Sequence, residues 1–243
     1  MDQGLFKAVR KQSLPEAIYD QLRTGILSGQ MAPGSVLPSE RQLAEVLGVN
    51  RQAVREALKR LEQARMVSIQ QGGQTRVLNF LESAGMDVLS QMLLTPEGGV
   101  QPKVLRSVIE MRAALAPDIA RLCALRASPA VRAAISEVVK EMESAGDDLP
   151  RLQDLSLRLW ELLVEGADNV AYRLAYNSLR ETYVPVRHVL TTLLSRELKA
   201  IKHYVALAAA VRQRSGTRAE EAARELMQRS TEDLLKLVKG LEP

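Results

Sequence analysis

Apolar residues recur at helical spacing in two short runs between positions 39 and 61. The apolar stripes consist of Leu43, Ala44 and Leu47, followed by Val54, Ala57, Leu58 and Leu61. Ser39 and Gln42 have the spacing of a capping box at the start of the first run, and Asn50 is a good N-cap for the second. Gly48 can adopt the left-handed conformation that ends a helix. The pattern predicts two helices joined by a turn of about three residues, which is a helix-turn-helix.

Two short β-prone runs follow, from Val67 to Gln70 and from Gln74 to Val77, around a pair of glycines. Glycines between such runs predict a β-hairpin. Directly after a helix-turn-helix, the hairpin is interpreted as a wing that lies along the DNA backbone or in the minor groove. A glycine pair is a weak signal, so a purely structural hairpin stays open as the alternative.

Beyond position 100 the chain has the apolar spacing of one helix after another, with almost no strand signal. The predicted helices span 103–127, 129–145, 150–166, 169–195 with a break near Pro185, 197–214 and 218–239. Pro117 is expected to kink or split the first of them. Because the loops between them are short, we expect an antiparallel all-α bundle.

Local signals mark several boundaries of these helices. The starts are predicted by Ser128 with Pro129 and by a capping box of Thr217 with Glu220, and the stops by Gly146 and Gly166. The expected fold is therefore mainly α, with an N-terminal winged helix-turn-helix and a C-terminal helical bundle. We expect three parts: a winged helix-turn-helix domain at 1–78, a linker helix at 79–100 and an all-helical domain at 101–243.

The second helix of the helix-turn-helix carries more hydrogen-bond donors than its own packing needs. Arg51, Gln52 and Arg55 lie within about one turn of its start, where a recognition helix presents side chains to base edges and phosphates. The alternative is that they are ordinary solvated charges of a surface helix. Residues 1–78 contain 11 Lys and Arg against 7 Asp and Glu, whereas residues 79–243 contain 22 of each. The excess positive charge therefore lies on the part expected to bind a polyanion.

The segment from Leu37 to Leu61, LPSERQLAEVLGVNRQAVREALKRL, resembles the DNA-binding domain of GntR-type bacterial transcription regulators. Because a helix-turn-helix protein normally binds as a twofold dimer, we expect residues 1–78 to bind double-stranded DNA at a palindromic operator as part of a homodimer. The DNA contacts that the resemblance implies are Arg41, Asn50, Arg51, Gln52 and Arg55, with Gln71 and Gly72 of the wing. Asn50 replaces the usual serine or threonine, and Arg65 stands where a helix-ending glycine is common.

The helical half is similar to the effector-binding domain of the FadR subgroup, through VIEMRAALAPDIARLCA and the spacing from Trp160 to Asn169. This resemblance implies that residues 101–243 bind an effector, and we expect them also to pair the subunits. Many members hold a metal ion with one Asp and three His. The positions of this chain that correspond to those ligands are Ser156, Trp160, Tyr204 and Ser230. The chain contains only two histidines, His188 and His203, so it cannot supply three imidazoles to one site. We therefore expect no metal and no cofactor.

The segment VLNFLESAGMDVLSQML resembles the interdomain region of the fatty-acid-responsive FadR regulators. This resemblance implies that the small-molecule effector is a long-chain acyl-CoA. Its binding would release the regulator from DNA. Such a site needs an apolar tunnel and cations for phosphates. The ligand-contact candidates are Arg112, Trp160, Tyr183 and Arg187. The alternatives are a metal-free sensor of a small carboxylate that uses Arg112, and a helical domain that serves dimerisation only.

Missing motifs and the composition of the chain limit which other kinds of protein this can be. There is no nucleophile elbow, phosphate loop or cluster of catalytic side chains, so we do not expect an enzyme. Cys123 is the only cysteine, which excludes an internal disulfide, and its apolar neighbours predict a core residue. No stretch approaches the length needed to cross a membrane, and the first residues lack the apolar run of a signal peptide. We therefore expect a protein of the bacterial cytoplasm that associates with the nucleoid.

Overall fold

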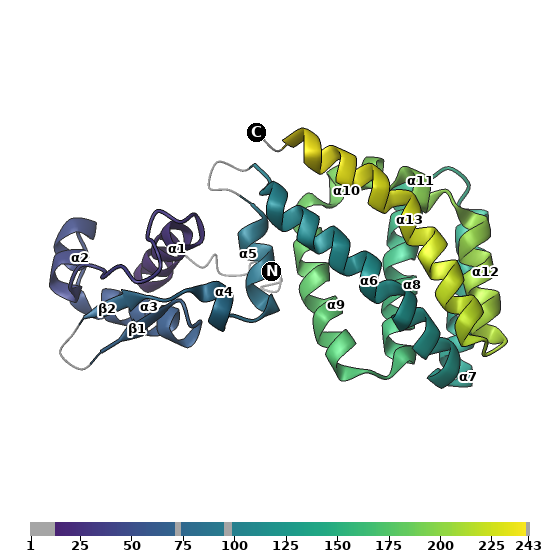
Figure 1. Cartoon of the computed structure of the whole chain (residues 1–243), viewed down its shortest axis with the longest axis horizontal. Coiled ribbons are helices and arrows are strands. Elements are labelled where there is room, and N and C mark those ends of the chain that lie inside the picture. The colour runs from purple at the N-terminus through teal and green to yellow at the C-terminus, as the bar shows by residue number, and fades with distance from the viewer. Residues whose placement is uncertain (1–12, 71–73, 95–98, 242–243) are drawn as a thin grey trace, which may run out of the picture. The chain divides into compact units, whose positions relative to one another are not determined.

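The computed structural model describes residues 13–70, 74–94 and 99–241 (Figure 1). The chain divides into two compact units, Met1–Val88 and Leu89–Pro243. Helices dominate both units, and the first also contains a two-stranded sheet. This architecture confirms the expected fold class. Within the described ranges, no helix combines the length and the apolar character needed to cross a membrane.

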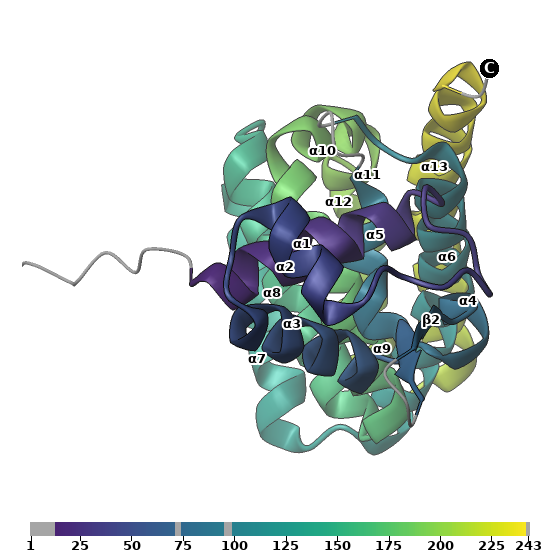
Figure 2. The ribbon, with the colours of Figure 1, turned by 90° about the vertical axis from the view of Figure 1, so that its left-hand side faces the viewer.

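The first unit is built around one central helix, α3. Its elements are α1 (Leu14–Leu27), α2 (Glu40–Leu47), α3 (Arg51–Gln63), β1 (Val67–Ile69), β2 (Thr75–Val77), α4 (Phe80–Ser83) and a 3-10 turn, η2 (Met86–Val88). Both α1 and α2 pack against α3 (Figure 2). Their buried side chains include Ile18, Leu22, Ile26, Leu43, Val54, Leu58 and Leu61. The apolar stripes read from the sequence thus form much of the core of this unit, although Leu47 at the end of α2 is only partly buried.

The caps predicted for the helix-turn-helix are present. Ser39 and Gln42 form a reciprocal capping box, and Gly48 ends α2 at a φ of 64°. The Asn50 Oδ1 accepts a hydrogen bond of 2.8 Å from the Ala53 amide at the start of α3. Arg65 takes a φ of 56°, so it adopts the left-handed conformation that a glycine commonly supplies after such a helix.

The predicted hairpin is an antiparallel pair in which Val67 lies opposite Val77 and Ile69 opposite Thr75. Val77 is buried against the helices, and Val36 forms an isolated antiparallel bridge to Arg76. The tip of the hairpin, residues 71–73, lies outside the described residues. The predicted wing contacts Gln71 and Gly72 belong to this tip.

The second unit is a bundle in which α6 lies alongside α13 (Figure 1). Its elements are α5 (Leu89–Leu93), α6 (Pro102–Arg126), α7 (Pro129–Ser144), α8 (Leu149–Ala167), α9 (Val170–Tyr183), η3 (Val184–Val186), α10 (Arg187–Leu193), α11 (Ser195–Leu198), α12 (Ile201–Arg212) and α13 (Gly216–Leu241). Helix α8 packs against α6 and α7, and α12 packs against α7 and α13. The short helix α5 packs against α9. The core includes Cys123, as predicted, and burial raises the pKa of its thiol to about 12.

Two predicted boundaries are wrong, and one of the two effects expected at Pro117 does not occur. The helix predicted at 197–214 is two helices, because the chain turns at Lys199 and Ala200 between α11 and α12. Pro117 does not split α6, which continues through it as one helix. Thr217 is not an N-cap, since α13 already begins at Gly216.

Gly166 was predicted to stop a helix but lies inside α8, which ends at Ala167. The left-handed residue at that end is Asp168, with a φ of 45°. A Cβ atom on Gly166 would lie 2.6 Å from the Cys123 Sγ and 2.9 Å from the Ala127 Cβ. Gly166 therefore permits the close approach of α8 to α6 instead of ending the helix.

Candidate nucleic-acid interface and effector pocket

The recognition helix α3 has one buried face and one exposed face. Val54 and Ala57 are fully buried, whereas Arg51, Gln52 and Arg55 are exposed. The Gln52 Nε2 donates to the Glu56 Oε1 at 3.0 Å. The helix therefore presents its basic first turns to solvent, as a helix that reads a major groove must.

Arg55 forms a two-pronged ion pair with Glu40 at the start of α2. The Arg55 Nε lies 3.1 Å from the Glu40 Oε1, and the Arg55 Nη2 lies 2.8 Å from the Glu40 Oε2. The hydrogen bonds to Arg55 lower the pKa of the Glu40 carboxyl. This pair fixes the guanidinium relative to both helices, and its remaining donors are free for a phosphate or a base. Glu40 is not among the site residues predicted from the sequence, although it directly precedes Arg41 in the same motif.

Two further predicted DNA contacts have local partners. Arg41 is exposed on α2 and pairs with Glu45 at 3.3 Å. The Asn50 Oδ1 already accepts the capping hydrogen bond of α3. Asn50 can therefore contact DNA only through the two N–H donors of its side-chain amide.

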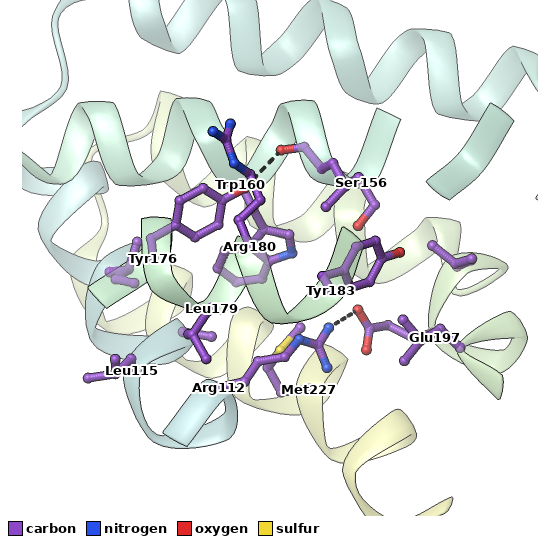
Figure 3. A pocket seen from close by; sticks show the side chains of 15 residues that line it. Arg112, Leu115, Ser156, Trp160, Tyr176, Leu179, Arg180, Tyr183, Glu197 and Met227 are labelled. Carbon is purple, nitrogen blue, oxygen red and sulfur yellow. Dashed lines mark hydrogen bonds and ion pairs between the residues drawn. The ribbon is translucent and has the colours of Figure 1, made fainter. Parts of the chain in front are cut away.

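A cavity of about 110 Å³ lies between α6, α8, α9, α11 and α13 (Figure 3). Its apolar and aromatic wall includes Leu115, Ile119, Trp160, Tyr176, Leu179, Tyr183 and Met227. Its charged and polar lining consists of Arg112, Ser156, Arg180 and Glu197. Burial raises the pKa values of Tyr176 and Tyr183 to about 12, so both phenols are neutral at physiological pH.

A buried ion pair lies at one side of this cavity. Arg112 pairs with Glu197 through Nη2 and donates through Nη1 to the Ser230 Oγ at 3.1 Å. The Ser230 hydroxyl also donates to Glu197. Glu197 is 1% exposed, whereas the Arg112 side chain is 28% exposed. Burial opposes the charge of Arg112, but Glu197 more than offsets this effect and raises the pKa of the guanidinium.

Trp160 lines the cavity and is 8% exposed. Its Nε1 is buried and has no hydrogen-bond partner among the described residues. The close-up shows the indole nitrogen on the edge of the ring nearer Tyr183 (Figure 3). Nearby, the Tyr176 hydroxyl donates to the Leu157 carbonyl oxygen at 3.3 Å.

The structure brings together three of the four predicted ligand contacts, Arg112, Trp160 and Tyr183. Arg187 is not among the residues that line the cavity. Its Nε lies 3.3 Å from the Gln153 Oε1, and its Nη2 pairs with Asp154 at the surface of α8.

The positions that correspond to metal ligands in the FadR subgroup lie around the same cavity. Ser156 and Trp160 line it, Tyr204 hydrogen-bonds to Ser156 at 3.3 Å, and Ser230 contacts Arg112. Across the described parts of the chain, no three His, Cys, Asp or Glu side chains are grouped to hold a metal ion. Glu197, Tyr176 and Leu179 also line the cavity but are not among the contacts predicted from the sequence. Only the spacing of Tyr176, Leu179 and Tyr183 along one helix face could have indicated part of this wall.

Comparisons with known proteins agree with this division of the chain. Residues 14–77 match the family model for bacterial regulatory proteins of the gntR family, and residues 107–229 match the FCD domain. The HTH-type transcriptional regulator Mce2R of Mycobacterium tuberculosis is 37% identical over 227 residues, which are 93% of this chain and 94% of that protein. The fatty acid metabolism regulator protein of Edwardsiella ictaluri is 29% identical over 178 residues, 73% of this chain and 72% of that protein.

A solved structure, E. coli McbR/YncC, covers 93% of this chain and 98% of its own, with 20% sequence identity and a TM-score of 0.50. At that identity it supports the fold alone. The family model and the close relative establish more: this chain belongs to the GntR family of bacterial regulatory proteins, as a DNA-binding transcription regulator with an FCD ligand-binding domain.

Proposed function

We propose that the effector of this regulator is a long-chain acyl-CoA whose acyl part enters the cavity beside Trp160, and that binding lowers the affinity for DNA. The observation that carries this proposal is the cavity wall, which is mainly aliphatic and aromatic. The relatives named fatty acid metabolism regulator proteins support the same effector class.

The alternative effector, a small carboxylate held by Arg112, is disfavoured by the ion pair in the cavity. Glu197 already neutralises Arg112, and a carboxylate ligand would have to compete with it. Displacing Glu197 would leave a carboxylate that is 1% exposed without its partner, which is costly.

The cavity is small for a long acyl chain, because sites for drug-sized ligands commonly measure roughly 300–1,000 Å³. An acyl chain must therefore part the helices that line the cavity. Helix α9 contributes Tyr176, Leu179, Arg180 and Tyr183 to the lining, and it packs against α5. Since α5 follows the DNA-binding unit directly in the chain, a shift of α9 is a route from the ligand to the linker. A ligand that binds the shifted arrangement more tightly shifts the population toward it.

On the DNA side, we propose a homodimer whose two α3 helices read half-sites about 34–36 Å apart. Arg41, Asn50, Arg51, Gln52 and Arg55 supply the contacts, with Gln71 and Gly72 of the wing. In this proposal, residues 1–78 bind DNA. Residues 101–243 bind the effector and pair the two subunits, and residues 79–100 connect these two domains. A change in the linker would respace the two recognition helices and release the operator.

Calorimetric titration of palmitoyl-CoA into the purified protein, with citrate as the control, tests the effector class. The proposal expects saturable binding of palmitoyl-CoA and none of citrate. Binding of citrate alone would favour the small-carboxylate sensor. Silence with both would favour a helical domain that serves dimerisation only, and hydrolysis of the thioester would favour an enzyme.

A further inference from the structure

The residues that line the cavity include a compensated charge pair, Arg112 with Glu197, and a tryptophan, Trp160, whose buried N–H has no partner among the described residues. An indole N–H can only donate, and that of Trp160 is buried without an acceptor among the residues described. Buried donors are normally satisfied, because an unpaired one loses its hydrogen bond to water without replacement. A ligand that places an acceptor oxygen at this nitrogen would remove that penalty.

The charges around the cavity restrict which acceptor fits. Arg112 is neutralised by Glu197, and Arg180 is half-exposed and pairs with Glu161 at 3.5 Å. An anionic acceptor at Trp160 would therefore meet no unpaired cation among Arg112 and Arg180, but would share the cavity with the buried carboxylate of Glu197. A carbonyl oxygen without formal charge avoids both problems, since it accepts from the indole and leaves the ion pair intact.

We propose, on the basis of the function proposed above, that the cavity selects the uncharged thioester of the acyl-CoA, with the Trp160 Nε1 donating to its carbonyl oxygen. The alkyl chain packs among Leu115, Leu179 and Met227. The charged phosphates of the coenzyme stay outside this cavity. The free fatty acid, which carries a carboxylate at the same position, binds more weakly.

The test removes the carbonyl from the ligand and the N–H from the protein. Calorimetry compares palmitoyl-CoA with S-hexadecyl-CoA, a thioether that keeps the chain and the coenzyme but lacks the carbonyl. The wild-type protein should bind palmitoyl-CoA about tenfold more tightly, the value of one buried hydrogen bond. In Trp160→Phe this preference should vanish. Leu179→Ala is the matched control, because it should weaken both ligands equally and preserve the preference.

An independent readout exists because Trp160 is the only tryptophan of the chain. Its indole N–H gives a single resonance in a ¹⁵N-correlated spectrum of the wild-type protein. Palmitoyl-CoA should shift the proton downfield, and S-hexadecyl-CoA should not. If Trp160→Phe fails to fold, benzothienylalanine at position 160 retains the ring shape and removes the N–H.

Equal affinity of the wild-type protein for the two ligands would overturn the assignment of the carbonyl while leaving acyl-CoA as the effector. A preference that persists in Trp160→Phe, or tighter binding of palmitate than of palmitoyl-CoA, would overturn it as well. Binding of neither coenzyme derivative would instead refute the proposed function, and the thioester assignment with it.

Discussion

Replacing Arg112 by alanine should destabilise the helical unit more than replacing its partner. Arg112→Ala leaves Glu197, which is 1% exposed, as a buried carboxylate without its cation. Removing one partner of a buried ion pair typically costs about 3–5 kcal/mol. Glu197→Ala leaves a guanidinium that is already 28% exposed and can turn toward water, so we expect a smaller loss of about 1–3 kcal/mol.

Denaturation by urea at pH 7, followed by tryptophan fluorescence, measures these losses. The single tryptophan, Trp160, lies in the helical unit, so the signal reports the unfolding of that unit. The double variant Arg112→Met with Glu197→Met is the control, because replacing both ions by apolar side chains is often neutral or stabilising. A loss below about 1 kcal/mol for Arg112→Ala, or a larger loss for Glu197→Ala, would contradict the dependence of the buried Glu197 carboxylate on Arg112.

Three further predictions concern local features of the two units. Asn50→Ala should lower the free energy of unfolding of the DNA-binding unit by about 1 kcal/mol in urea denaturation, and Asn50→Ser should retain most of it, because serine also caps a helix. Gly166→Ala should destabilise the helical unit by about 1–3 kcal/mol, since the new Cβ would lie 2.6 Å from the Cys123 Sγ; an unchanged midpoint would contradict the close packing. Burial and the nearby Arg229 lower the pKa of His203 despite Glu225, so the folded protein resists its protonation. Stability should therefore fall as the pH decreases through about 6.5, where the unfolded chain takes up the proton, and His203→Gln should lose less stability over the same pH range.

The helix-turn-helix could be predicted almost residue by residue because its signals are local. Ser39, Gly48 and Asn50 each act on backbone groups within four positions of themselves, so their roles are visible in the sequence. Gly166 shows the limit of such signals. A glycine at the end of an apolar run fits both a helix stop and a close helix contact, and only the position of Cys123 decides between them.

The effector cavity depends on partners that are distant in the sequence. Arg112 and Glu197 are 85 positions apart, and no periodicity connects them. Arg187 lies in the same part of the chain as Tyr183, yet its side chain pairs with Asp154 and does not line the cavity. Spacing along one helix predicts which side chains share a face, but not whether that face meets a core or a cavity.

We propose that one ligand, bound in the helical unit, controls DNA binding by α3. Fluorescence anisotropy of an operator selected from genomic DNA, titrated with the protein with and without palmitoyl-CoA, tests it most directly. We predict that palmitoyl-CoA weakens operator binding at least tenfold and that citrate has no effect. The Arg51→Ala variant should bind the operator about tenfold more weakly than the wild-type protein. The affinity of this variant for palmitoyl-CoA should be unchanged. Saturable binding of palmitoyl-CoA that leaves the operator affinity unaltered would contradict the account.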